Sequence, residues 1–180
     1  IVEERLGTLS GPKPQAYIEL GTNAEEYGNT YGNKMWGILI PRAGGDNIAA
    51  DLVDGYAPLS PEKVLQENPD IIILTGANWP KRQNSLKLGY YVEPEVSSKL
   101  IEKFINRPGW KDLDAVKNKR VYGIHHGLSR EVWDFYPIQC FAKWFYPDLF
   151  ADLDPDATLQ EFHRRFLDME LSGTWSTALD

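Results

Sequence analysis

The chain has 180 residues, of which 42% are hydrophobic and 12% aromatic, a composition typical of one globular domain with a sizeable core. Its net charge of -7 argues against nucleic acid or an anionic membrane surface as the main partner, because both require a basic face. No run approaches the roughly 18 apolar residues needed to cross a bilayer, and no signal-peptide pattern is present. The single cysteine, Cys140, excludes an internal disulfide.

The first third of the chain predicts a helix, a strand and a second helix. The expected elements are a helix over 1–9, a strand over 15–20, a polar loop over 24–33 and a helix with Met35, Ile38 and Leu39 on its core side. Gly44-Gly45 is expected to close the second helix, because glycine adopts positive φ without strain.

The stretch 54–76 predicts a capped helix followed by a buried strand. Ser60 is placed to accept hydrogen bonds from the first turn, and Pro61 at the first helical position has no N–H to leave unpaired. Asn68 is expected to end this helix, because a residue before proline is pushed out of the helical region. The run 71–74 is apolar without alternation, which indicates a strand covered on both faces, as in parallel sheets.

The second half predicts two more helices before a third strand, and two helices after it. The core sides are expected at Val96, Leu100, Ile101 and Phe104, then at Ile138, Phe141, Ala142 and Phe145 after Pro137, and finally at Leu159, Phe162, Phe166 and Met169. A short helix over 110–118, a strand over 120–124 and a loop over 128–136 lie between, and Thr158 with Glu161 suggests a capping box for the last helix. Helices between strands predict an α/β fold, a three-layer sandwich around a mostly parallel sheet.

Aromatic and imidazole side chains follow all three predicted strands. They are Tyr27, Tyr31 and Trp36 after the first strand, Trp79 after the second, and His125 and His126 after the third. Ligands bind beyond the carboxyl ends of parallel strands, so these loops are expected to converge on a site for a flat or apolar ligand. The alternative is that each aromatic side chain only packs its own loop.

The two adjacent histidines do not indicate a metal centre. Neighbouring residues of an extended segment point to opposite sides, and no cysteine or carboxylate stands beside them at ligand spacing, so we expect no protein-bound metal and no cofactor. A hydrolase using Ser129, His126 and Asp134 is a remaining alternative, but the chain has no nucleophile-elbow motif, and we expect it not to be an enzyme.

Short motifs spread over nearly the whole chain resemble the substrate-binding proteins of ABC importers that capture iron-siderophores, haem or cobalamin. The motifs are Gly44-Gly45 with Asn47-Ile48, Ser60-Pro61-Glu62, Asn68-Pro69-Asp70, Arg107-Pro108-Gly109-Trp110, Ala115-Val116-Lys117-Asn118, Arg120-Val121-Tyr122 and Tyr146-Pro147. The match is to one lobe of a bilobed protein. The resemblance implies a Rossmann-like C-terminal lobe over 13–180, preceded over 1–12 by the end of the helix that joins the two lobes.

The resemblance also implies roles for three residues. Tyr56 would face the ligand across the cleft between the lobes, and Glu62 would pair with an arginine of the membrane permease. Arg130 would contact an anionic siderophore. The alternatives are that Tyr56 braces its loop, that Glu62 only favours the positive end of its helix, worth about 0.3–1 kcal/mol, and that Arg130 is merely solvated.

The partners implied are the chelate ligand and an ABC permease, with no nucleic acid, and with membrane contact only through the permease or a lipid anchor. The implied location of the parent protein is periplasmic or extracytoplasmic and membrane-anchored. A ligand sensor of the same fold is the main alternative. Aromatic side chains and one or two cations suit haem, cobalamin and ferric chelates alike, so the identity of the ligand stays open.

Overall fold

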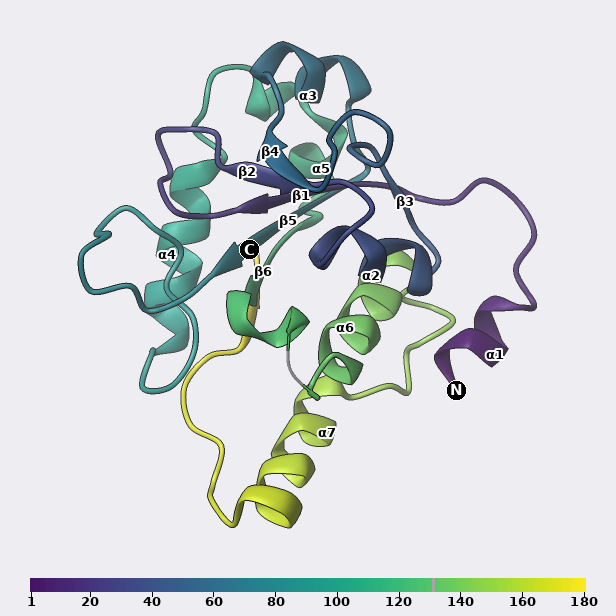
Figure 1. Ribbon diagram of the computed structural model, residues 1–180, viewed down its shortest axis with the longest axis vertical. Coiled ribbons are helices and arrows are strands. Elements are labelled where there is room, and N and C mark those ends of the chain that lie inside the picture. The colour runs from purple at the N-terminus through teal and green to yellow at the C-terminus, as the bar shows by residue number, and fades with distance from the viewer. Residues whose placement is uncertain (131) are drawn as a thin grey trace.

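The computed structural model describes residues 1–130 and 132–180. Within them, seven strands form one mixed sheet in the order β4-β2-β1-β5-β6-β7, with β3 paired to β1 (Figure 1). The strands are β1 (Gln15–Leu20), β2 (Asn29–Tyr31), β3 (Asp46–Asn47), β4 (Tyr56–Pro58), β5 (Ile71–Gly76), β6 (Val121–His125) and β7 (Ser176–Ala178). β1 runs parallel to β3 and β5, and β5 to β6, whereas β2, β4 and β7 pair antiparallel with their neighbours.

Helices cover both faces of the sheet, as Figure 1 shows. They are α1 (Val2–Leu6), α2 (Trp36–Arg42), α3 (Pro61–Glu67), α4 (Pro94–Phe104), α5 (Asp114–Lys117), α6 (Phe135–Phe145) and α7 (Pro155–Phe162). Short helical turns η1 (Trp110–Asp112), η2 (His126–Ser129) and η3 (His163–Leu167) complete the set, and η3 has π-helical hydrogen bonding. No helix in the described part of the chain is long and apolar enough to cross a membrane.

The central strand β5 shows how the layers form. Ile71 and Ile73 point into one apolar core with residues of α2 and α6, whereas Ile72 and Leu74 point into a second core with residues of α3 and α4. All six residues of β5 are buried, as a strand with helices on both faces requires. The structure therefore confirms the three-layer α/β sandwich, with a sheet that is parallel at its centre and antiparallel at its edges.

The helix before β5 forms as its sequence predicts. The Ser60 side chain accepts a hydrogen bond from the Lys63 N–H at 3.2 Å, and Pro61 is the first helical residue. Asn68 ends the helix in the left-handed region, with φ of 44°. These local signals are strong enough to fix both ends of α3.

Several sequence predictions about element boundaries and core faces are wrong. The predicted loop 24–33 contains β2, and β3, β4 and β7 are also absent from the predicted set. Each of these strands has only two or three residues, too few to show a period of two. α6 begins at Phe135, two residues before Pro137, because proline is tolerated throughout the first helical turn.

The predicted core faces of α2 and of the last helix also need correction. Ile38 is 49% exposed, because α2 instead turns Trp36, Leu39 and Ile40 inward. Phe166 is 65% exposed and Met169 is exposed as well, because the α-helical period ends at α7 and the chain continues as η3.

The capping box predicted for α7 is also wrong. The residue that caps α7 is Asp154, whose side chain accepts a hydrogen bond from the Ala157 N–H at 2.9 Å. Glu161 pairs with Arg164 at 2.7 Å instead of reaching back to the start of the helix.

A buried ion pair ties β1 to the segment after α4. The Arg107 guanidinium donates to both carboxylate oxygens of Glu19 at 2.9 Å, and both side chains are almost completely buried. The same guanidinium donates to three backbone oxygens of the loop after β1 and lies over the rings of Tyr27, Phe104 and Trp110. Arg107 therefore holds this loop in place from inside the domain.

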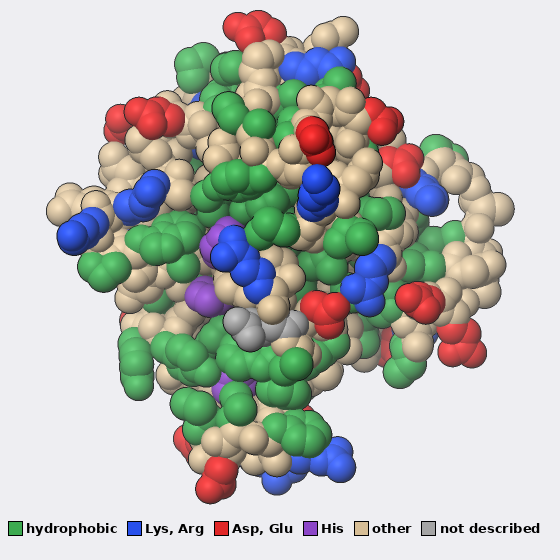
Figure 2. All heavy atoms as spheres, in the orientation of Figure 1, with side chains coloured by type: hydrophobic (Ala, Val, Ile, Leu, Met, Phe, Trp, Pro, Cys, Tyr) green, Lys and Arg blue, Asp and Glu red, His purple; other side chains and the backbone are tan. Residues whose placement is uncertain are grey.

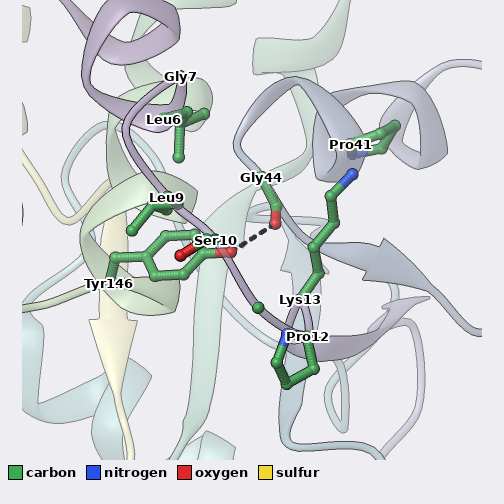
Figure 3. Close-up of a pocket in the computed structure, with 10 residues that line it drawn as sticks. Leu6, Gly7, Leu9, Ser10, Pro12, Lys13, Pro41, Gly44 and Tyr146 are labelled. Carbon is green, nitrogen blue, oxygen red and sulfur yellow. Dashed lines mark hydrogen bonds between the residues drawn. The ribbon is translucent and has the colours of Figure 1, made fainter.

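The N-terminal helix α1 packs against α6 and the segment that follows it. Arg5 pairs with Asp152 at 2.5 Å, and the Tyr146 hydroxyl donates to the Gly44 carbonyl at 2.8 Å (Figure 3). Gly44 has φ of 89°, and a Cβ there would lie 2.7 Å from a Leu6 methyl group. A cavity of about 320 Å³ lies beside these residues, lined in part by Lys13.

Candidate functional site

The loops that follow β5 and β6 meet at one surface of the domain. β5 leads to Trp79, β6 leads into η2, and the edge strand β4 begins with Tyr56. On the face that carries η2 and β4, Figure 2 shows hydrophobic side chains gathered around the middle, with histidine and Lys or Arg side chains among them. We take this surface as the candidate site.

Two tyrosines form one side of the candidate site. Tyr31 and Tyr56 face each other in the register of β2 and β4, and their ring centroids are 5.1 Å apart. Tyr56 is 46% exposed and offers an aromatic face to a ligand, whereas Tyr31 is fully buried beneath it. Burial and the neighbouring Tyr56 raise the pKa of Tyr31, so its hydroxyl stays protonated.

His126 forms the centre of the candidate site. Its Nδ1 lies 3.1 Å from the Thr75 hydroxyl, at the end of β5, and its ring is 5.8 Å from that of Trp79. Burial, Arg130 and His125 lower the pKa of His126 to about 4. The imidazole is therefore neutral at pH 7, and one nitrogen is already engaged by Thr75.

Arg130 supplies positive charge at the same place. It is exposed immediately after η2, and it is near enough to lower the pKa of both His126 and Tyr31. Arginine suits carboxylate and other oxyanion groups because its N–H donors form a planar fork. The surface therefore joins aromatic faces to a cation and a neutral imidazole.

His125 lies behind the surface. Its ring is 4.8 Å from that of Trp175, and Gly89 and Gly127 pack closely against it. Its Nδ1 is buried without a hydrogen-bond partner among the described residues, and burial lowers its pKa to about 4. The two histidines thus point to different surroundings, as adjacent residues at the end of a strand should.

The structure does not bring every predicted residue to this surface. Trp36 is fully buried, and its ring lies 6.0 Å from that of Phe141 in the core between the sheet and α6. Tyr27 lies elsewhere, where its hydroxyl accepts a hydrogen bond from the Trp110 indole N–H at 2.6 Å. Of the three aromatic residues expected from the segment after β1, only Tyr31 therefore lies beside this surface, against Tyr56.

Two residues that shape the surface were missed by the sequence analysis. Thr75 engages His126, and Lys87 donates to the backbone oxygens of Trp79 and Arg82 at 2.5 and 2.6 Å, which fixes the loop carrying Trp79. The available signal for Thr75 was a hydroxyl near the end of an otherwise apolar strand. Nothing in the sequence pattern distinguished Lys87 from the other basic residues of its loop.

The described residues do not assemble the alternative hydrolase site. The Ser129 hydroxyl is buried without a hydrogen-bond partner among them, and Asp134 pairs with Arg42 at 3.1 Å. A nucleophile must contact its base, and His126 engages Thr75 instead. In the same part of the chain no group of three or more His, Cys, Asp or Glu side chains could hold a metal ion.

Glu62 lies apart from the candidate site. It is exposed in the first turn of α3, on the other face of the sheet from α2 and α6. The carboxylate favours the positive end of the helix, and its exposure leaves it accessible to a second protein.

Comparison with known proteins gives consistent matches. The sequence profile described as "Periplasmic binding protein" matches residues 2–127. The crystal structure of the TroA-like periplasmic binding protein FepB from Veillonella parvula matches this chain with 43% sequence identity and a TM-score of 0.96. The match covers 99% of this chain and 52% of that protein's chain.

Two curated proteins extend this comparison. The molybdate-binding protein MolA of Haemophilus influenzae is 25% identical over 178 residues, which are 92% of this chain and 42% of that protein. The uncharacterized ABC transporter substrate-binding lipoprotein YvrC of Bacillus subtilis is 25% identical over 157 residues, 84% of this chain and 42% of that protein. The chain thus spans about half the length of the relatives it matches.

Proposed function

The chain belongs to the periplasmic binding protein family, and from this we propose that it is part of the solute-binding component of an ABC importer. The solute would be an iron-siderophore, haem or a corrinoid, with a molybdate-like oxyanion as a further candidate suggested by the relative MolA. The parent protein would deliver it to a membrane permease. This is a binding family, and the proposal includes no catalysis.

The observation that carries the proposal is the grouping of Tyr56, Trp79, His126 and Arg130 at one surface. Tyr56 and Trp79 offer aromatic faces that suit a flat or apolar ligand, and Arg130 suits its anionic groups. A ligand site of this kind is largely preformed, because Thr75 and Lys87 already fix its central side chain and its loop.

The candidate site would be one wall of a cleft. We infer that residues 13–180 form the C-terminal lobe, that residues 1–12 end the helix joining the two lobes, and that a second lobe supplies the opposite wall. The share of the relatives that this chain covers, about half, supports this division. The isolated 180-residue chain is therefore expected to fold but to bind its solute weakly.

Tryptophan fluorescence of the full-length protein tests the proposal directly. Titration with haem, cyanocobalamin, several ferric siderophores and molybdate is expected to give saturable quenching by one of them, because Trp79 lies at the site. Tyr56→Ala should weaken that binding about tenfold, which corresponds to about 1.4 kcal/mol.

The matched control is Tyr91→Ala. Tyr91 is 86% exposed, and the ring beside it is that of Tyr90, 6.3 Å away, and not one of the site residues, so its removal should leave the affinity unchanged. Equal losses in the two variants would contradict the assignment of the site, and no quenching by any solute would shift the proposal to a ligand sensor of the same fold.

The proposed location follows the same family. The parent protein would be periplasmic or extracytoplasmic, and the relative YvrC, a lipoprotein, supports a lipid anchor as one way of holding it at the membrane. Fractionation of cells that express the full-length gene would separate the free form from the anchored form.

A further inference from the structure

A polar groove lies between the loops that follow β1 and β5. The two loops project from the same side of the molecule (Figure 1), and the groove between them has a volume of about 430 Å³. Backbone hydrogen bonds join the loops, from the Ala24 N–H to the Asn84 oxygen and from the Leu86 N–H to the Gly21 oxygen, both at 2.9 Å. The volume is in the range of small-molecule sites, and the lining includes Thr22, Asn23, Glu26, Lys81, Arg82 and Gln83.

The wall of the polar groove that follows β1 is fixed from inside by Arg107. The guanidinium donates to the backbone oxygens of Asn23, Ala24 and Glu26 at 2.9, 3.0 and 2.5 Å. These carbonyl groups are therefore turned toward the interior, while the Glu26 side chain remains exposed. This wall keeps its shape without any ligand.

The wall that follows β5 is fixed in the same way by Lys87. Its ammonium group donates to the backbone oxygens of Trp79 and Arg82 at 2.5 and 2.6 Å, and the Ser85 hydroxyl donates to the Arg82 oxygen at 2.7 Å. In a planar trans peptide the Gln83 N–H points opposite to the Arg82 carbonyl, so it adds a donor on the outer side of the loop. Because both carbonyl oxygens contact one nitrogen atom, Trp79 at the candidate site and Arg82 in the groove lie side by side.

Lys81 and Arg82 give the polar groove positive charge. Both side chains are exposed, and neither forms an ion pair within the described part of the chain. In a chain with a net charge of -7, two such cations on one fixed loop favour an anion, and the arginine fork suits a carboxylate. On the other wall, the Glu26 carboxylate and the Thr22 hydroxyl can accept hydrogen bonds, which suits hydroxyl groups of the same ligand.

We propose that the polar groove binds a hydroxycarboxylate, a molecule with carboxylate groups beside a hydroxyl group. The two cations and the Gln83 N–H would bind its carboxylates, and Glu26 would accept a hydrogen bond from its hydroxyl group. This chemistry can belong to a free hydroxy acid or to an arm of a larger solute that lies on Trp79. The inference goes beyond the proposed function, because the groove lies wholly within this chain and requires no second lobe.

Calorimetry with citrate and tricarballylate tests the ligand class. Tricarballylate has the same carboxylate groups as citrate but lacks the hydroxyl group. Each is titrated into the full-length protein in buffer without metal ions and at constant ionic strength, because salt screens exposed charges. Citrate should bind saturably and about tenfold more tightly than tricarballylate, since only citrate can donate to a carboxylate of the groove. Equal affinities would overturn the assignment to a hydroxycarboxylate.

The double variant Lys81→Gln with Arg82→Gln tests the location. Citrate affinity should fall at least about tenfold, whereas the thermal midpoint should not change, because these exposed side chains hold no part of the fold together. Its matched control is Lys99→Gln with Lys103→Gln, which makes the same change in net charge on exposed positions of α4. Equal losses in the two double variants would show an effect of net charge alone and would overturn the proposal.

The two sources of the carboxylate are separated by the solute. Citrate binding that persists at saturating solute indicates a free hydroxy acid, and a loss of solute affinity in Lys81→Gln with Arg82→Gln indicates an arm of the solute. Citrate binding without binding of any solute would leave the inference standing and contradict the proposed function. Solute binding without citrate binding, with solute affinity unchanged in that variant, would overturn the inference and leave the proposed function standing.

Discussion

Arg107 is a charged side chain that is almost completely buried. It belongs to a motif that resembles a transporter family, but its contacts are internal: a carboxylate, three carbonyl oxygens and three aromatic rings. Removing one member of such a pair leaves the other as an uncompensated buried charge. Its role is therefore to hold the loop after β1, not to contact a partner.

Arg107→Met should lower the free energy of unfolding by about 3–5 kcal/mol, because Glu19 would stay buried and charged without its partner. The double variant Glu19→Gln with Arg107→Met should be more stable than the single variant, since the charge is then gone. Urea denaturation followed by fluorescence measures both. Equal losses in the single and double variants would show that packing, and not charge, is responsible.

Sequence reasoning located some residues of the candidate site and missed others for identifiable reasons. Trp79 and His126 could be predicted, because loops after adjacent parallel strands must meet at one edge of the sheet. Trp36 could not be placed, since an aromatic residue at a helix start fits a core as well as a surface. Thr75 was missed because its role depends on His126 in η2, and a hydroxyl near the end of an apolar strand does not show that contact.

At the scale of elements, the start of α7 shows how local signals compete. Two segments offered capping groups, and the chain uses the earlier one, in which Asp154 precedes Pro155. A proline at the first helical position needs no hydrogen-bond partner and has the correct φ, so it favours the start that was overlooked. The positions of the long helices were predicted better than their ends, because a period extends over many residues whereas a cap depends on one. Single residues of the predicted core faces still proved exposed, among them Ile38 of α2 and Val96 of α4.

Asp154→Ala should destabilise the domain by about 0.5–2 kcal/mol, because the Ala157 N–H loses its acceptor at the exposed end of the helix. Glu161→Ala, at the position of the incorrectly predicted capping box, removes only an exposed pair with Arg164 and should cost less than about 1 kcal/mol. Thermal unfolding of the two variants decides between the caps. A larger loss of thermal stability for Glu161→Ala than for Asp154→Ala would indicate that the capping box forms after all.

At the scale of the whole molecule, the candidate site and Glu62 lie on different parts of the lobe, so the proposed solute capture and the proposed docking to a permease can be tested apart. Glu62→Lys in the full-length protein should reduce solute uptake by vesicles that contain the permease, with solute affinity unchanged, because electrostatic pairing guides docking. Its matched control is Glu95→Lys, which also reverses an exposed carboxylate in the first turn of a helix.

Both charge reversals should cost about 0.3–1 kcal/mol of stability through the helix dipole, so stability alone cannot separate them. Transport separates them: a loss with Glu62→Lys and none with Glu95→Lys supports docking. Equal transport in both variants would show that Glu62 has no docking role and only favours the start of α3.

The outer strands of the sheet have a consequence for the behaviour of the protein at high concentration. β4 has three residues and includes Pro58, which has no N–H, while β7 closes the other side with three residues. Long flat edges allow neighbouring molecules to join their sheets and aggregate, and short edges interrupted by proline resist this. The lobe should therefore remain dispersed when crowded, since neither side of its sheet offers a stretch long enough to recruit another copy.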